Sequence, residues 1–331
     1  MNADVLPRIQ TSDQRVSGAI AALEARFPGT AWTLSGDSQQ CRKSRVVFLA
    51  TADGVHRAGL KLYADARAAR RQGEALLYAA AVDRQQGHAV PALYHLDADA
   101  GALLVEWLDA PHLETVLVRS ALDPSRHRQT LARVGAWLGD FHSVGHVEPA
   151  PFDAERYRRQ LATRIAGAEA GAVVLAADPL WDRGRAWLER QLVLQDGTPV
   201  PSGCIHGDFT FTNVLVTPDS VTGIDIWAEP DVPLVEDLAR MFVYLAMGDP
   251  LPLRARIGAV PLAARRAQQA LLEGYGGLDP ASASVWETLV CYEALARWLA
   301  LSDRLARRGS FSERWKRAGL RGVLTSIVGR G

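Results

Sequence analysis

The sequence predicts an α+β fold in two parts, a small antiparallel sheet with one helix followed by a larger, mainly helical part. Two observations predict this arrangement. Short β-type segments separated by turns gather before residue 108, whereas long segments of helical periodicity dominate after it. One polar, strand-like stretch at 203–225 interrupts the helices. We therefore divide the chain into residues 1–107, a connecting segment 108–112, and residues 113–331.

The first part begins with a helix and continues mainly with strands. Val16, Ile20 and Leu23 recur at helical spacing after a Ser-Asp start. A turn ending at Gly54 joins two strand-like segments, and the Ala- and Arg-rich run after Asp65 has high helix propensity. The predicted elements are a helix at 12–27, strands at 32–34, 45–50 and 55–63, a helix at 65–86, and strands at 92–97 and 102–107.

The second part is predominantly helical, because apolar residues recur there at helical spacing. The predicted helices cover 113–120, 124–144, 152–169, 182–195, 235–247, 261–275, 283–308 and 312–328. The C-terminal end is basic, with eight basic residues and one acid, Glu313, from Arg304 to Gly331. We favour a last helix docked on the second part, and contact of this basic C-terminal helix with an anionic membrane is the alternative.

The composition is that of a globular protein, with 48 % hydrophobic and 22 % charged residues among 331. The 37 basic and 37 acidic side chains cancel, so we expect no nucleic-acid partner. Cys41, Cys204 and Cys291 stand far apart, which fits neither a disulfide framework nor a zinc site. The first residues lack a signal-peptide core and no apolar run reaches 18 residues, so we expect a cytoplasmic protein.

The stretch CIHGDFTFTNVLVTPDSVTGIDIW carries the polar residues that indicate chemistry. Asp208 and Asn213 lie in one compact loop, and the turn at Pro218 folds the next strand back so that Asp225 comes beside Asn213. Carboxylate and amide oxygens are hard ligands that suit Mg²⁺, which completes its shell with water and phosphate oxygens. The stretch therefore predicts a site for magnesium and a nucleoside triphosphate, suited to phosphoryl transfer.

The motif HGDFTFTN followed by GID resembles the catalytic loop and metal-binding segment of the aminoglycoside phosphotransferase and choline kinase family, small-molecule kinases distantly related to protein kinases. The resemblance covers most of the chain. It implies a two-lobed, protein-kinase-like fold, in which the three segments are a nucleotide-binding lobe, a hinge, and a lobe for catalysis and substrate. It also implies Asp208 as catalytic base, Asn213 as metal ligand, and Asp225 as the carboxylate that bridges Mg²⁺ to the phosphates of ATP.

Lys61 is one of only three lysines among the 37 basic residues. It lies in a strand whose alternation places Ala58, Leu60 and Leu62 on the opposite face, so we expect its side chain to face a cleft. The resemblance implies that Lys61 binds the α and β phosphates and pairs with Glu74 in the following helix.

Two further groups of residues receive roles from the resemblance. The hinge residues expected to bind adenine through their backbone are Glu106, Trp107 and Leu108. The residues expected to support the catalytic loop are His142, His206 and Asp237. We expect the His206 ring to hold backbone rather than act as a general base.

The first hypothesis is a Mg-ATP-dependent kinase that phosphorylates a hydroxyl group of a small molecule. The segment 35–44 has one glycine and no GxGxxG motif, so its phosphate contacts and the choice between ATP and GTP stay open. This departure supports the alternative, a nucleotide-binding protein of little transfer activity that acts through a partner. A protein kinase is disfavoured, because HGD replaces HRD and Asp237 follows Asp225 by only twelve residues.

The sequence does not choose the acceptor. A cationic antibiotic or amine would need acids on the helices of the second lobe, an anionic acceptor would need arginines, and a sugar is equally compatible. The candidate acids are Glu155, Glu169, Asp178, Asp182, Asp231, Glu287, Glu293 and Asp303. The candidate arginines are Arg156, Arg158, Arg159, Arg297 and Arg304. The oligomeric state also stays open.

Overall fold

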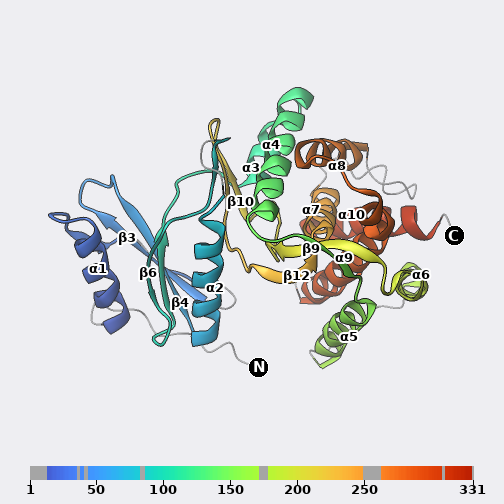
Figure 1. Cartoon of the computed structure of the whole chain (residues 1–331), viewed down its shortest axis with the longest axis horizontal. Helices are drawn as coiled ribbons and strands as arrows, with labels where there is room; N and C mark the ends of the chain where they lie inside the picture. The colour runs from blue at the N-terminus through green and yellow to red at the C-terminus, as the bar shows by residue number, and fades with distance from the viewer. Residues whose placement is uncertain are drawn as a thin grey trace.

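The N-terminal part of the chain is a six-stranded antiparallel sheet between two helices (Figure 1). The computed structural model describes residues 13–35, 38–40, 44–82, 86–170, 178–248, 262–307 and 310–329. The strands of this sheet are β1 (Trp32–Leu34), β2 (Gln39–Gln40), β3 (Ser44–Thr51), β4 (Arg57–Tyr63), β6 (Leu93–Asp97) and β7 (Ala102–Glu106). Their order is β1-β3-β4-β7-β6, with β2 paired to β3.

Helices α1 (Gln14–Arg26) and α2 (Ala66–Ala79) cover opposite faces of this sheet (Figure 1). Both helices begin after an aspartate whose side chain accepts a hydrogen bond from the first turn. Leu60 of β4 packs in the cluster under α1, whereas Leu103 of β7 packs with α2. Because side chains alternate along a strand, Lys61 lies on the face that α2 covers.

A second, small sheet ties the two parts of the chain together. Strand β5 (His88–Ala89) follows α2 and pairs in parallel with β11 (Val221–Gly223), which forms a hairpin with β10 (Val214–Val216). Gly87 leads into β5 with φ +74°, and a Cβ there would overlap the carbonyl oxygen of Asp219. The backbone therefore approaches this hairpin at a point where only glycine fits.

The C-terminal part is a helical bundle with one further sheet. Its helices are α3 (Leu113–Arg119), α4 (Pro124–Ser143), α5 (Ala154–Ala170), α6 (Pro179–Gln195), α7 (Val235–Met247), α8 (Leu262–Tyr275), α9 (Pro280–Arg307) and α10 (Phe311–Val328). The sheet has the order β12-β9-β8, formed by β8 (Glu148–Pro151), β9 (Pro199–Ile205) and β12 (Glu229–Pro233). Helix α7 is buried along almost its whole length and contributes to both large apolar clusters of this part.

The predicted fold class is confirmed, and most predicted elements are present within a few residues of their expected bounds. The helix predicted at 65–86 ends earlier, at Ala79. Strands β2, β5, β8, β9 and β12 were not predicted, because they are short or rich in proline and charge and lack the alternation of a half-buried strand. Cys291 is buried and Cys204 half-buried, and both are free thiols, whereas Cys41 lies outside the described residues.

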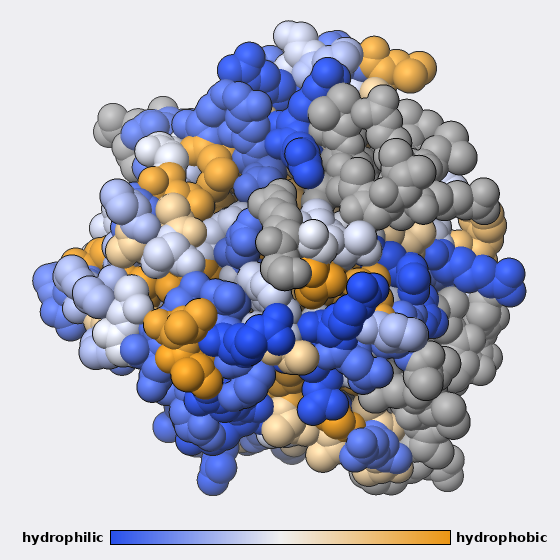
Figure 2. All heavy atoms as spheres, turned by 90° about the vertical axis from the view of Figure 1, so that its right-hand side faces the viewer, coloured by the Kyte–Doolittle hydropathy of each residue, from blue (hydrophilic) through white to orange (hydrophobic). Residues whose placement is uncertain are grey.

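The last helix, α10, docks on the second part as we favoured. Leu320, Val323, Leu324 and Ile327 on its apolar side are buried with residues of other helices. Figure 2 shows this end of the molecule, where hydrophilic atoms dominate and apolar residues form small separate patches. No helix in the part of the chain that the structure describes is long and apolar enough to cross a membrane.

Helices α4 and α8 approach each other through glycines. A Cβ at Gly274 would overlap the carbonyl oxygen of Ala132, and one at Gly135 would overlap the carbonyl oxygen of Leu271. The two backbones are therefore closer than any side chain allows.

We predict that Gly274→Ala lowers the free energy of unfolding by about 1–3 kcal/mol, because the added methyl group must push the two helices apart. Chemical denaturation measures this loss. Gly167→Ala is the matched control, since a Cβ there would have no atom within 4 Å apart from its chain neighbours and the backbone of its own helix. The control gains at most about 1 kcal/mol from helix propensity. A Gly274→Ala variant as stable as the parent would contradict the close packing of α4 and α8.

Candidate active site

The β10–β11 hairpin brings Asn213 and Asp225 to the same edge. Val214 pairs with Gly223, and the Ile224 N–H donates to the Asn213 carbonyl oxygen at 2.9 Å. Asp225 follows directly, with a left-handed φ of +57° that a non-glycine residue rarely adopts. The side-by-side placement expected from the sequence is therefore present, and the strained backbone of Asp225 is held by the hairpin.

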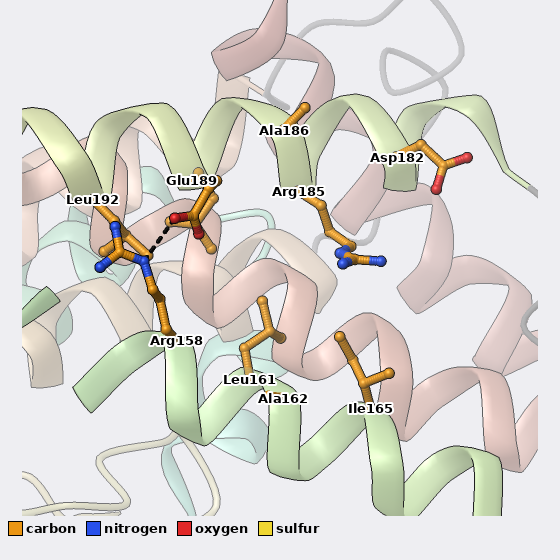
Figure 3. A pocket seen from close by; sticks show the side chains of 10 residues that line it. Arg158, Leu161, Ala162, Ile165, Asp182, Arg185, Ala186, Glu189 and Leu192 are labelled. Carbon is orange, nitrogen blue, oxygen red and sulfur yellow. Dashed lines mark hydrogen bonds and ion pairs between the residues drawn. The ribbon is translucent and has the colours of Figure 1, made fainter. Parts of the chain in front are cut away.

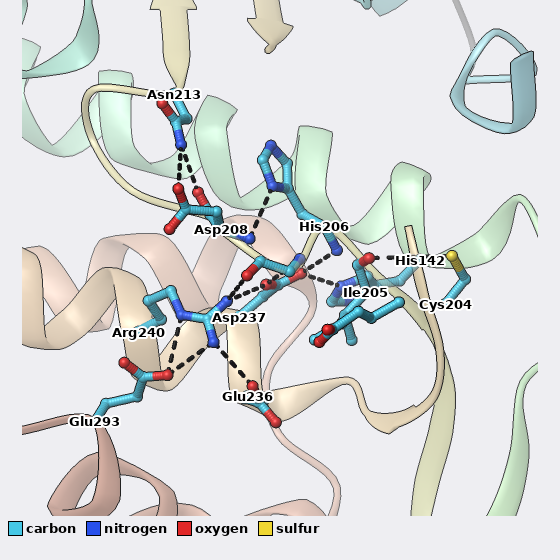
Figure 4. A network of polar contacts seen from close by, with 12 residues as sticks. His142, Cys204, Ile205, His206, Asp208, Asn213, Glu236, Asp237, Arg240 and Glu293 are labelled. Atoms are coloured by element: carbon cyan, nitrogen blue, oxygen red, sulfur yellow. Dashed lines mark hydrogen bonds and ion pairs between the residues drawn. The ribbon is translucent and has the colours of Figure 1, made fainter. Parts of the chain in front are cut away.

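Asn213 also connects the hairpin to Asp208. Its Nδ2 donates to the Asp208 carbonyl oxygen at 2.9 Å and to the Asp208 Oδ2 at 3.0 Å (Figure 4). Both bonds use the amide nitrogen of Asn213. The side-chain atom of Asn213 that can bind a cation is therefore its oxygen, Oδ1. The carboxylates of Asp208 and Asp225 and the amide oxygen of Asn213 thus form a group of hard oxygen donors, which fits Mg²⁺.

Lys61 reaches this group from the other lobe. Its Nζ forms an ion pair with Oδ1 of Asp225, and the two side chains are 20 % and 46 % exposed. Burial between the lobes disfavours the charged carboxylate, but the Lys61 ammonium outweighs it and holds the pKa of Asp225 below its ordinary value. The alternation expected for this strand agrees with the structure, since Ala58, Leu60 and Leu62 are buried on the face opposite to Lys61.

The predicted pair of Lys61 and Glu74 is not formed. Glu74 lies on the exposed side of α2, and the described residues contain no ion pair between the two. Helix periodicity gives the reason: the buried side of α2 carries Gln72, which is 2 % exposed and donates through Nε2 to the Ile226 carbonyl oxygen at 2.8 Å. Gln72 lies on the same helix face as the buried Ala75, and this helical spacing was the signal in the sequence that Gln72 faces inward.

The buried Asp237 holds the loop before Asp208. Its Oδ2 accepts from the His206 N–H at 2.6 Å, and its Oδ1 accepts from the Gly207 N–H at 3.1 Å. His142 lies 3.2 Å from Oδ2 through Nε2, and its Nδ1 is 2.9 Å from the Tyr275 hydroxyl. Burial opposes ionisation of Asp237, but the hydrogen bond from His142 and the surrounding positive charge hold its pKa below the ordinary value.

The His206 ring lies fully buried beneath the loop. Its Nδ1 accepts from the Asp208 N–H at 3.3 Å, and its carbonyl oxygen accepts from the Trp227 N–H at 2.8 Å. Burial lowers the pKa of His206, which favours the neutral ring. His206 therefore contacts the backbone on two sides, at Asp208 and at Trp227.

The sequence analysis missed Arg240, which is central to this network (Figure 4). The buried guanidinium donates to Glu293 at 2.8 and 3.0 Å, to Glu236 at 2.9 Å, and to the carbonyl oxygen of Gly207. Burial raises the pKa of Glu236, which also accepts a hydrogen bond from the Tyr157 hydroxyl. The signal in the sequence was the i, i+4 pair of Glu236 and Arg240 in a helix whose only other charged residue is Asp237.

The hinge residues lie at the end of β7, whose last residue is Glu106 and which pairs with β4 on one side and β6 on the other. The Glu106 N–H donates to Ala92 O at 2.9 Å, and the Trp107 N–H donates to Arg57 O at 3.2 Å. Trp107 is 39 % exposed, and its ring meets Phe48 edge-on at 4.6 Å. Both N–H groups are therefore engaged within the protein, and Leu108 is half-buried. Much of the 35–44 segment lies outside the described residues.

A separate hollow of about 410 Å³ lies between α5 and α6 (Figure 3). Leu161, Ile165 and Leu192 contribute to its apolar lining, and Arg158 and Glu189 form a 2.7 Å hydrogen-bonded ion pair at its rim. Two residues named in the sequence analysis as acceptor candidates, Arg158 and Asp182, line it, whereas none of the residues expected to act in catalysis or to bind nucleotide or metal does. The hollow is therefore distinct from the group around Asp208.

The chain belongs to the phosphotransferase enzyme family, whose model matches residues 42–225, more than half of the chain. The matched range contains Lys61, Asp208, Asn213 and Asp225. This match confirms the resemblance that the HGD motif indicated. A comparison with curated proteins found no match.

Solved structures of small-molecule kinases share the fold. An amicoumacin kinase has a TM-score of 0.57 at 13 % identity, covering 95 % of this chain and 96 % of its own. A glucosamine kinase has a TM-score of 0.56 at 18 % identity, covering 92 % and 83 %. A choline/ethanolamine kinase family protein from Mesorhizobium loti has a TM-score of 0.52 at 16 % identity, covering 96 % and 100 %. At these identities the likeness establishes the protein-kinase-like fold.

We predict that Asp237→Asn lowers the free energy of unfolding by about 2–4 kcal/mol, because a buried charge that accepts several hydrogen bonds is lost. The pKa of Asp237 is lowered in the folded state, so its contribution is fully present above the ordinary aspartate value of 3.8 and is lost as the pH falls below it. The acid-side slope of stability should therefore be shallower in the variant.

Urea denaturation from pH 3 to pH 7 measures both effects. Asp99→Asn, whose side chain is 97 % exposed, is the control and should stay within about 0.5 kcal/mol of the parent. An Asp237→Asn variant with the stability and acid slope of the parent would show that Asp237 does not hold the loop.

Proposed function

We propose that the protein is a Mg-ATP-dependent phosphotransferase that moves the γ-phosphate of ATP to a hydroxyl group of a small molecule, acting in the cytoplasm. The observation that carries this proposal is the convergence of Lys61 from one lobe with Asp208, Asn213 and Asp225 from the other. The amicoumacin kinase of the same fold was solved with AMP-PNP, Ca²⁺ and Ami, which supports a triphosphate and a divalent cation in such a site.

Each lobe then has its own task in the proposal. Residues 1–107 hold the nucleotide, with adenine against Glu106, Trp107 and Leu108 where the hinge 108–112 begins, and residues 113–331 hold the catalytic loop and the acceptor. Asn213 and Asp225 would hold Mg²⁺, which when bound neutralises charge on the phosphates. As the nucleotide binds, the Lys61 ammonium leaves the Asp225 carboxylate and binds the α and β phosphates. The exchange is possible because the carboxylate and the phosphates are both anions that can pair with the same ammonium group.

Asp208 accepts the proton of the acceptor hydroxyl. The hydroxyl oxygen forms a bond to the γ-phosphorus while the bond from that phosphorus to the β–γ bridging oxygen breaks, and ADP leaves. The Asn213 amide fixes one oxygen of Asp208 at 3.0 Å and leaves the other for the acceptor. The loop therefore orients the base without competing for its proton.

Asp208→Asn should lower kcat by at least about 100-fold while the Kd for ATP changes little, because the amide cannot accept the proton. ADP formation against a panel of aminoglycosides, amines and sugars measures kcat, and calorimetry measures ATP binding. Asp219→Asn, in the exposed turn between β10 and β11, is the matched control and should keep the parent rate. Full turnover in Asp208→Asn would remove the mechanism, and parent protein without turnover on any acceptor would favour the alternative of a nucleotide-binding protein.

Lys61→Met should lower kcat/KM for ATP by about 100-fold or more, since a cation on the nonreacting phosphates is lost. Steady-state kinetics at varied ATP concentration measures the change. The control is Lys316→Met on α10, which removes a lysine of the other lobe. Equal kcat/KM values in the two variants would contradict the role proposed for Lys61.

A further inference from the structure

A group of charged residues lies directly beside the catalytic loop. Gly207, which precedes Asp208, has φ +81°, and a Cβ there would lie 3.1 Å from Trp227 Cβ and 3.7 Å from Glu229 Cγ. Trp227 and Glu229 therefore pack against the backbone that carries Asp208. A molecule whose hydroxyl group reaches Asp208 would lie near them.

Two arginines from different lobes meet at Glu229. Arg71 of α2 donates to Oε1 of Glu229 at 3.3 Å, and Arg156 of α5 donates to Oε2 at 3.3 Å. The Arg71 guanidinium also lies over the Trp227 ring, 5.5 Å from its centroid. We call Arg71, Arg156 and Glu229 the arginine cluster. Its formal charge is positive, with two cations around one carboxylate.

The guanidinium groups of the cluster have more donors than the protein uses. A guanidinium has five N–H groups, and each of the two arginines makes one long side-chain hydrogen bond to the described residues. The buried Nε of Arg156 has no hydrogen-bond partner there. Their side chains are 48 % and 22 % exposed, so a ligand can reach the remaining donors.

The neighbouring acids are already neutralised. Asp225 pairs with Lys61, Glu236 with Arg240, and Glu293 with both Arg240 and Arg297. Both oxygens of Glu229 are held by the arginine cluster. A cationic acceptor would have to displace an arginine from one of these carboxylates, or use the exposed Asp231 on β12. An anionic acceptor would meet donors that are not used.

We propose that the acceptor carries an anionic group, a phosphate or a carboxylate, which Arg156 and Arg71 bind beside Asp208. This inference rests on the proposed function and specifies its substrate class. The planar guanidinium matches either oxyanion with two parallel hydrogen bonds, and Glu229 keeps the two arginines in place while the site is empty of acceptor. Because Arg71 belongs to the first lobe, the anion also draws the two lobes together.

The test measures binding of four sugar probes to the protein saturated with ADP and Mg²⁺. Glucose 6-phosphate and glucuronate carry the two anions, glucose is neutral, and glucosamine is cationic. Calorimetry should show either anion binding about 10- to 100-fold tighter than glucose, with the preference lost in Arg156→Met and Arg71→Met. Glu229→Gln should strengthen anion binding, since it frees donors, and a merely structural role would not give this gain.

Arg159→Met is the matched control, because Arg159 is exposed on the same helix as Arg156, and it should keep the preference. Arg71→Met changes a half-exposed side chain, so it tests the cluster even if Arg156→Met does not fold. Three outcomes would overturn the inference. Glucose or glucosamine could bind as tightly as the anions or more tightly, or none of the four probes could bind. The third is an anion preference that the variants of the cluster keep. Probe binding is measured without phosphoryl transfer, so it tests the substrate class separately from the reaction. Turnover that does not depend on Asp208 would remove the proposed function but would leave the binding result standing.

Discussion

The ion pair of Lys61 with Asp225 is the interaction on which the rest of the site depends. It joins a strand of the first lobe to the end of a hairpin in the second, and these residues are 164 positions apart in the chain. Each charge makes the position of the other favourable, because a charged group buried between two lobes loses hydration free energy unless an opposite charge compensates for it. In the function we propose, the pair therefore sets where the triphosphate lies and which carboxylate stands opposite it.

Hydrogen bonds from α7 hold the backbone of the loop before Asp208. Asp237 receives the backbone N–H groups of His206 and Gly207, and Arg240 donates to the Gly207 carbonyl oxygen, so three backbone groups of the loop are fixed by one helix, α7. Burying such charges is costly unless they are paired, and here each has partners. The loop thus keeps its shape before any substrate binds, which reduces the cost of orienting Asp208.

Much of the fold was predictable from the sequence because its signals are local. Helical periodicity and strand alternation gave most of the elements, and the alternation around Lys61 gave its face correctly. Glu74 was misplaced, since a motif specifies a spacing and only the packing of α2 decides that Gln72 faces inward. Arg240 was missed, and of the arginine cluster only Arg156 was named as a candidate for an anionic acceptor, because the partners Glu293, Glu229 and Arg71 come from distant segments. The roles assigned to the hinge residues and to Asn213 remain predictions.

The most direct test of the central claim is the effect of Mg²⁺ on ATP affinity, measured by calorimetry in the parent protein and in Asp225→Asn. If Asp225 and Lys61 share one triphosphate and magnesium site, the parent protein binds ATP more tightly with Mg²⁺ than without it, and the variant loses this difference. An ATP affinity that is independent of Mg²⁺ in the parent protein, or a full magnesium effect in Asp225→Asn, would contradict the account.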